Sequence, residues 1–181
     1  MPMRVIAGTL RHRHLEYPEN NVNIRPTKDR IREAFFSSMG DITDKSFLDL
    51  CAGCGSMGIE AISRGAKNAV FVDNNKVSQG FINKNIKSLN IENALLINKD
   101  IFEAFDLFKD QKITFDIVYF DPPYESAFYE DAIACIYNNK LLSDNGVLAF
   151  ECNRKINVNP SWYSSIKEYH YGDITVVVLR K

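Results

Sequence analysis

Five short apolar segments, separated by segments with helical spacing, most constrain how this 181-residue chain can fold. The apolar segments are continuous rather than alternating, which is typical of strands covered on both faces of a sheet. They are residues 46–52, 69–73, 94–98, 115–120 and 146–151. Between them, residues 75–89 and 126–142 carry apolar side chains at every third or fourth position. The alternation predicts a doubly wound α/β fold whose sheet is mostly parallel.

The two ends of the chain depart from this alternation. Residues 164–171 and 174–181 are extended segments joined by a short turn, which predicts an antiparallel hairpin at one edge of the sheet. Near the N-terminus, residues 3–8 and 13–17 predict a smaller β-hairpin. A helix is then expected from about Lys28, N-capped by Thr27 and ending before Gly40. We therefore expect a basic β-hairpin extension over residues 1–24 and one compact domain over residues 25–181.

The net charge of −1 hides an uneven distribution along the chain. Residues 1–32 hold seven arginines and lysines against three acidic residues, so they carry +4 and the remainder carries −5. A cationic segment on a mildly acidic body indicates a polyanionic partner at one edge of the molecule. An arginine-rich surface that is simply solvated would give the same pattern, so charge alone leaves both interpretations open.

Composition also indicates the cellular compartment of the chain and whether it binds a membrane or a metal. No uncharged apolar run approaches membrane-spanning length, and the N-terminus lacks the apolar stretch of a secretory signal. Four cysteines without a framework spacing are typical of a reducing compartment. Cys51 and Cys54 form a C-x-x-C, but no second pair or histidine accompanies them, so no metal is expected. We expect a cytoplasmic monomer with no membrane partner.

Gly53, Gly55 and Gly58 form a G-x-G-x-x-G turn between a predicted strand and a predicted helix. Such a turn lets a ligand approach the free backbone N–H groups at the start of the helix. Asp73, at the end of the next strand, is placed to accept hydrogen bonds from a ribose diol. Nicotinamide, flavin and S-adenosylmethionine (SAM) sites share these features, so the turn alone does not identify the cofactor.

Two further acids favour SAM. Asp49 precedes the turn by four residues, in the D-x-x-x-G-x-G arrangement of Rossmann-like methyltransferases, although it could also be a simple turn acid. Asp100 follows the third strand, where such enzymes place an acid against the adenine amine, and it could equally cap a helix. The predicted cofactor contacts are Asp49, Ala52, Gly53, Gly55, Asp73, Asn74, Asp100 and Ile101.

The sequence Asp121-Pro122-Pro123-Tyr124 ends the segment 115–120 in a rigid corner, because proline cannot extend a central strand. An exocyclic amine on a nucleobase is a poor nucleophile, because its lone pair is delocalised into the ring. The Asp121 carboxylate and the Pro122 carbonyl can accept its two hydrogens and free that lone pair. Tyr124 offers a face on which a flipped-out base can stack. These three residues are the predicted catalytic group.

A D-P-P-Y corner downstream of a SAM turn resembles the [DNS]-P-P-[YFW] signature of amino-group methyltransferases. With "MRVIAGTLRHRHL", "IRPTKDRIREAFF", "LDLCAGCGSMGIEAISRGA" and "YGDITVVVL", it resembles the RsmD family over nearly the whole chain. These bacterial enzymes methylate the guanine N2 amine in 16S ribosomal RNA. The family's usual glycine turn differs at Cys51, Cys54, Ser56 and Met57, and Glu is common at Asp73, but these side chains flank a site made mostly by backbone.

The resemblance implies a class I SAM-dependent methyltransferase with a seven-stranded sheet and an N-terminal β-hairpin extension. It implies SAM as methyl donor and 16S ribosomal RNA as partner, within the 30S subunit or an assembly intermediate. The RNA contacts it implies are Arg4, Arg11, Arg13, Arg25, Thr27 and Arg30.

Rival functions explain less of the sequence. DNA adenine methyltransferases share the D-P-P-Y corner but normally carry a separate target-recognition domain, for which this chain has no insertion. Protein-glutamine methyltransferases carry Asn in place of Asp121, and a nicotinamide oxidoreductase would leave the corner unexplained. A non-catalytic RNA-binding module would explain the basic segment but not the four strand-end aspartates. Adenine-N6 methylation of DNA or of another RNA stays open as the alternative activity.

Overall fold

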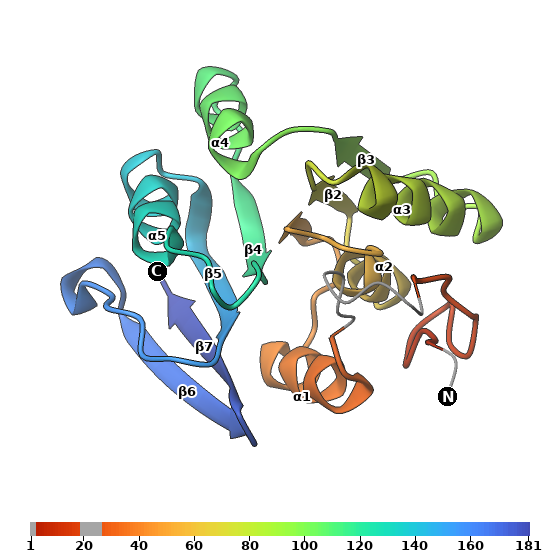
Figure 1. Ribbon diagram of the computed structural model, residues 1–181, viewed down its shortest axis with the longest axis horizontal. Coiled ribbons are helices and arrows are strands. Elements are labelled where there is room, and N and C mark those ends of the chain that lie inside the picture. The colour runs from red at the N-terminus through yellow and green to blue at the C-terminus, as the bar shows by residue number, and fades with distance from the viewer. Residues whose placement is uncertain (1–2, 19–26) are drawn as a thin grey trace.

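The computed structural model describes residues 3–18 and 27–181. Its strands are β1 (Ser46–Leu50), β2 (Asn68–Val72), β3 (Ala94–Ile97), β4 (Phe115–Phe120), β5 (Leu142–Cys152), β6 (Ser165–Tyr171) and β7 (Ile174–Arg180). Its helices are α1 (Asp29–Met39), α2 (Ser56–Ser63), α3 (Lys76–Ser88), α4 (Ile101–Asp110), α5 (Tyr129–Asn138) and the short 3-10 helix η1 (Pro160–Trp162). The strands form one seven-stranded sheet in the order β3-β2-β1-β4-β5-β7-β6 (Figure 1).

The first five strands of the sheet are parallel, and β7 runs antiparallel between β5 and β6. This confirms the predicted mostly parallel sheet with a closing hairpin. In register, Leu50 lies between Val72 and Phe120, so β1, β2 and β4 end together. The turns that follow these three strands therefore meet at one edge of the sheet, where open α/β folds place their ligands.

Helices cover both faces of the sheet, which explains the continuous apolar strands (Figure 1). On one face, α1, α2 and α3 contribute Phe35, Met57 and Ile82 to a core that also contains Phe47 and Phe71. On the other face, α4 and α5 pack on a second core rich in phenylalanine. Among the apolar positions that predicted the helix over 75–89, Val77 differs, because it is 46% exposed at the start of α3.

The predicted strand over 146–151 is longer than expected, because β5 begins at Leu142. Its pairing with β4 shifts register between Phe115 and Ile117, where the polar residues of β5 form a bulge. The Asp116 carboxylate stabilises this irregularity by accepting bonds from the hydroxyls of Ser46 and Ser143 at 3.0 and 2.6 Å. A polar bulge inside a strand has the same local sequence as a turn. The local pattern therefore predicts a strand that begins at residue 146 instead of at Leu142.

Residues 3–18 form an arm that lies beside α2 (Figure 1). Its two predicted hairpin segments are antiparallel and are joined by backbone hydrogen bonds from Val5, His12 and Leu15. They form an isolated bridge between Arg4 and His14 rather than two full strands. The reason is that the N–H groups of Ile6 and Ala7 donate to the buried Glu60 carboxylate at 2.8 and 3.0 Å instead of to a hairpin partner. The arm is therefore held mainly by α2.

Asn85 connects the arm to the glycine turn. It is fully buried in α3, and its side-chain oxygen accepts from the Glu16 N–H at 2.8 Å. Its side-chain nitrogen donates to the Glu16 carbonyl at 2.9 Å and to the Cys54 carbonyl at 3.0 Å. One amide thus fixes the end of the arm against the start of the predicted cofactor turn.

Replacing Gly8 with alanine is expected to detach the arm from α2. Gly8 has a φ of +84°, and an added Cβ would lie 1.8 Å from the Ser63 carbonyl oxygen, which is backbone and cannot rotate away. Hydrogen exchange at the Ile6 and Ala7 amides should accelerate by at least about tenfold. The matched control is Gly80→Ala in α3, where a Cβ meets nothing within 4 Å. Unchanged exchange at Ile6 and Ala7 would show that the arm tolerates the methyl group.

The start of α1 corrects one prediction. Lys28, not Thr27, occupies the N-cap position, and among the described residues no side chain makes a capping hydrogen bond to the helix. The Thr27 hydroxyl instead donates to the Asp121 carboxylate at 3.5 Å, and Thr27 is only 8% exposed. Across the described ranges, no helix is both long and apolar enough to cross a membrane.

Candidate active site

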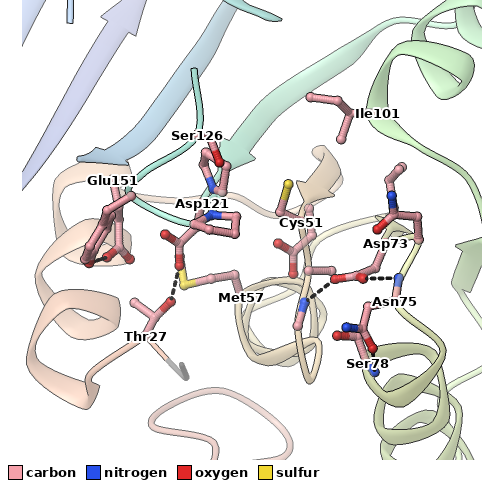
Figure 2. Close-up of a pocket in the computed structure, with 18 of the residues that line it drawn as sticks. Thr27, Cys51, Met57, Asp73, Asn75, Ser78, Ile101, Asp121, Ser126 and Glu151 are labelled. Atoms are coloured by element: carbon pink, nitrogen blue, oxygen red, sulfur yellow. Dashed lines mark hydrogen bonds between the residues drawn. The ribbon is translucent and has the colours of Figure 1, made fainter. Parts of the chain in front are cut away.

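A cavity of about 700 Å³ opens at the edge of the sheet where β1, β2 and β4 end. Figure 2 shows Thr27, Asp121 and Glu151 at one end of it and Asp73, Asn75 and Ser78 at the other, with Cys51 and Met57 between them. The predicted catalytic residues and seven of the eight predicted cofactor contacts line this single space. These residues are Asp49, Ala52, Gly53, Asp73, Asn74, Asp100, Ile101, Asp121, Pro122 and Tyr124.

Gly55 is the predicted cofactor contact that does not line the cavity. It has a φ of +81° at the N-cap of α2, and an added Cβ would lie 3.2 Å from the Phe71 ring. Gly58 is tighter still, because its Cβ would lie 2.3 Å from the same ring. These two glycines let α2 start close to β2, and Gly53 is left as the glycine of the motif that faces the ligand space.

The Asp73 carboxylate fixes the conformation of the glycine turn by accepting backbone hydrogen bonds. One oxygen of its carboxylate accepts from the Gly53 N–H at 2.9 Å and the other accepts from the Asn75 N–H at 2.9 Å. Burial raises the pKa of Asp73, and these two N–H donors oppose the shift. Because a carboxylate has about four acceptor sites, Asp73 retains capacity for a ribose hydroxyl.

Asp49 is 2% exposed at the end of β1 and accepts from the Gly58 N–H at 2.9 Å. Burial raises its pKa to about 8, against the lowering effect of that hydrogen bond. Asp49 thus joins the first strand to α2. The carboxyl group that it presents to the cavity is mostly protonated at neutral pH and ionises above pH 8. A bound cation would favour its ionised form.

Asp49 should make the protein less stable as the pH rises. Its pKa is about 8 in the folded chain and near 3.8 when unfolded, so folding favours the protonated form. This contribution to the free energy of unfolding is complete below pH 4 and is lost between pH 4 and 8. The slope approaches about 1.4 kcal/mol per pH unit. Urea unfolding of the wild type and Asp49→Asn across this range isolates the effect, and a pH-independent difference between them would refute it.

Asp100 is confirmed as a helix cap. Its side chain accepts from the Phe102 N–H at 2.9 Å, and Glu103 closes a capping box on the Asp100 N–H. Asp100 also lines the cavity together with Ile101 and Lys99. Capping and a cofactor contact are compatible, since the cap uses only part of the capacity of the carboxylate.

The Asp121 corner is fixed by contacts on both sides. The Asp121 N–H donates to the Leu50 carbonyl at 3.3 Å, which extends the pairing of β4 with β1 by one residue. The Tyr129 hydroxyl lies 3.5 Å from the Pro122 carbonyl and donates to the Glu151 carbonyl at 2.9 Å. Since a carbonyl oxygen has two lone pairs, Pro122 can accept another hydrogen from a ligand.

Sequence reasoning missed Glu151, which is 2% exposed and lines the cavity at the end of β5. Its carboxylate accepts from the Tyr119 hydroxyl at 2.6 Å and from the Tyr124 hydroxyl at 3.4 Å. The sequence held one signal, an acid at the end of an apolar strand that follows the D-P-P-Y strand. Met57 and Ser78 also line the cavity, and no sequence pattern distinguished them.

The residues predicted to contact RNA lie in different places. Arg4, Arg11, Arg13 and Arg30 are exposed, the first three on the arm and the last on α1. Thr27 faces Asp121, as described above, and Arg25 lies outside the described residues. Within residues 3–18 and 27–181, no three histidine, cysteine, aspartate or glutamate side chains are grouped to hold a metal ion.

Comparison with known proteins places the chain in a family. Residues 3–180 match the family model described as Conserved hypothetical protein 95. The chain is 33% identical over 177 residues to ribosomal RNA small subunit methyltransferase D of Haemophilus influenzae, covering 96% of this chain and 91% of that protein. This chain belongs to the RsmD family.

Two further similarities agree with membership of the RsmD family. Ribosomal RNA small subunit methyltransferase D of Escherichia coli K12 is 36% identical over 151 residues, which cover 82% of this chain and 71% of that protein. The solved structure of the Escherichia coli protein yhhF is 29% identical with a TM-score of 0.84, covering 100% of this chain and 98% of that one. The seven-stranded, mostly parallel α/β fold predicted from the RsmD resemblance is therefore confirmed.

Proposed function

We propose that this RsmD-family chain transfers a methyl group from SAM to the N2 amine of one guanine in 16S ribosomal RNA. The observation that carries the proposal is the shared cavity, in which the glycine turn after β1 and the D-P-P-Y corner after β4 face the same space. The names of the relatives support a small-subunit RNA substrate. A ribosomal substrate would also place the enzyme in the cytoplasm.

The donor set at one end of the cavity fits SAM. Gly53 lets backbone approach the ligand, Asp73 can accept from a ribose diol, and Asp100 can accept from an adenine amine. The acidic character of this end suits a ligand with a positive charge, since Asp73 and Asp100 line it and a bound cation would favour the ionised form of Asp49. SAM supplies a methyl group that is already electrophilic because it is bonded to a sulfonium.

At the other end, the corner residues would orient and activate the target amine. Asp121 and the Pro122 carbonyl accept the two amine hydrogens, which pulls the nitrogen toward tetrahedral geometry and frees its lone pair. Tyr124 stacks on the flipped-out base. The nitrogen would then gain the methyl group as the carbon–sulfur bond breaks, which leaves a neutral thioether, and its surplus proton would pass afterwards to Asp121 or to water. Positioning in line provides most of the rate enhancement, so Asp121 need not be a strong base.

The arm would belong to an RNA-binding extension over residues 1–24, attached to the methyltransferase domain over residues 25–181. Arg4, Arg11 and Arg13 are exposed on it, and exposed arginines can neutralise phosphates along a backbone. Because α2 holds the arm and also follows the glycine turn, RNA bound to the arm would lie close to the cavity. A folded small-subunit particle is the partner that this arrangement favours.

Two measurements test the proposed activity. SAM should raise the melting temperature of the protein and NAD should not, because the cavity is built for a cationic methyl donor. Methyl-labelled SAM should then pass label to unmodified 16S RNA, free or in 30S particles, and not to duplex DNA. Stabilisation by NAD alone, or transfer of label to DNA alone, would refute the proposal.

A further inference from the structure

Glu151 has no role in the motifs that predicted the site, although it lies beside the D-P-P-Y corner. We infer that Glu151 selects guanine over adenine by accepting the N1–H group of the target base. The inference rests on the proposed function and adds to it a residue that reads the base. It is carried by the strand register, by the hydrogen bonds of Glu151 and by the difference between the two purine edges.

The register of the sheet places Glu151 next to Asp121. Phe120, the last residue of β4, pairs with Phe150 of β5, so Asp121 directly after β4 lies level with Glu151 in the neighbouring parallel strand. Such strands lie about 4.8 Å apart, and side chains at matching positions project to the same face. Figure 2 shows both carboxylates at one end of the cavity, which both residues line. They can therefore contact neighbouring atoms of one base edge.

The hydrogen bonds of Glu151 fix it as an acceptor. The Tyr119 hydroxyl donates to one oxygen at 2.6 Å and the Tyr124 hydroxyl donates to the other at 3.4 Å. Burial and the nearby Glu151 charge raise the pKa of Tyr119 well above its ordinary value, so that hydroxyl keeps its proton and remains a donor. Phenol donors on both oxygens favour the ionised form of the carboxylate, and a carboxylate has about four acceptor sites.

The two purines differ at the atom next to the reactive amine. In guanine, the N2 amine lies beside N1–H, which is a donor. In adenine, the N6 amine lies beside N1, which is an acceptor. With the amine held by Asp121 and the Pro122 carbonyl, a carboxylate at the neighbouring position binds the guanine N1–H and repels the adenine N1. A site that hydrogen-bonds one substrate rejects the analogue that lacks the donor, because a buried polar group is then left unpaired.

The test compares two RNAs that differ only at the methylated position, which carries either guanine or 2-aminopurine. 2-Aminopurine keeps the 2-amino group but lacks the N1–H. The wild type should prefer guanine in kcat/KM by at least about tenfold. Glu151→Gln can donate its amide to N1, so the preference should fall by at least about tenfold in the variant. 2-Aminopurine also lacks O6, which affects the wild type and the variant alike. Comparing the guanine to 2-aminopurine ratio of kcat/KM between the two enzymes therefore cancels this effect.

Two variants separate base reading from a structural role. Tyr119→Phe removes one of the two hydroxyls bound to Glu151 but leaves the carboxylate and the Tyr124 donor, so it should keep most of the preference for guanine. SAM affinity, measured for every variant, reports whether the fold is intact. If Glu151→Gln does not fold, Glu151→Asp replaces it, because its withdrawn carboxylate should also reduce the preference.

The outcomes distinguish the inference from the proposed function. If the wild type transfers no methyl group to guanine RNA, the proposed function fails. If it methylates guanine but Glu151→Gln slows both RNAs equally, the function stands and Glu151 only supports Tyr119 and Tyr124. A preference that falls in Glu151→Gln and survives in Tyr119→Phe supports selection by Glu151.

Discussion

Replacing Asp121 with alanine should lower the rate of methyl transfer by at least about 100-fold, in line with the loss of one group aligned on a reacting atom. Asp121 lies at the end of the cavity away from Asp73, so the cofactor end keeps its contacts. SAM affinity should therefore stay within a few-fold of the wild type. Single-turnover kinetics with saturating SAM separate the two quantities.

Two controls complete this experiment. Asp121→Asn keeps one oxygen acceptor and should retain more activity than Asp121→Ala. Asp131→Ala removes an exposed carboxylate from α5 and should leave the rate unchanged. Robust turnover by Asp121→Ala would remove this carboxylate from the proposed mechanism, whereas equal losses of turnover and SAM affinity would mean that it acts through the cofactor.

Replacing Arg11, Arg13 and Arg30 together with glutamine is expected to weaken RNA binding. The binding constant should also depend less steeply on salt concentration. Each phosphate contact that is lost removes about 0.7 from the slope of log K against log salt for single strands, so three contacts remove about 2. Binding titrations at several salt concentrations measure this slope. The affinity for SAM should not change, because none of the three residues lines the cavity.

The matched control for the arginines replaces three exposed lysines on the α4 and α5 side of the molecule, Lys109, Lys112 and Lys140, by glutamine. It removes the same charge but leaves the arm intact, so it should change the slope much less. If the two triple variants have the same slope, neither the arm nor the start of α1 is the RNA contact and the net charge alone governs binding.

Most of the fold could be predicted from local patterns. Continuous apolar runs identified the parallel strands, because burial on both faces leaves no room for polar alternation. The start of β5 was misplaced because the bulge there is polar and depends on Asp116, a residue of another strand. Local propensity identifies an element more reliably than its boundary, which long-range contacts decide.

The candidate site was predictable where chemistry depends on short motifs and was missed where it depends on distant contacts. The glycine turn and the D-P-P-Y corner are contiguous in sequence, and both line the cavity. Thr27 had the chemistry of a helix cap, but its hydroxyl bonds to Asp121, 94 positions away. Glu151 and Asn85 likewise depend on partners in other elements, for which the sequence offers no local pattern.

The central claim, transfer to a guanine N2 amine, is tested most directly by identifying the methylated nucleoside. Unmodified 30S particles and free 16S RNA are incubated with the protein and methyl-labelled SAM, the RNA is digested to nucleosides, and the position is mapped by fragment mass. We expect N2-methylguanosine at a single position. Label in N6-methyladenosine, or label spread over many positions, would contradict the account.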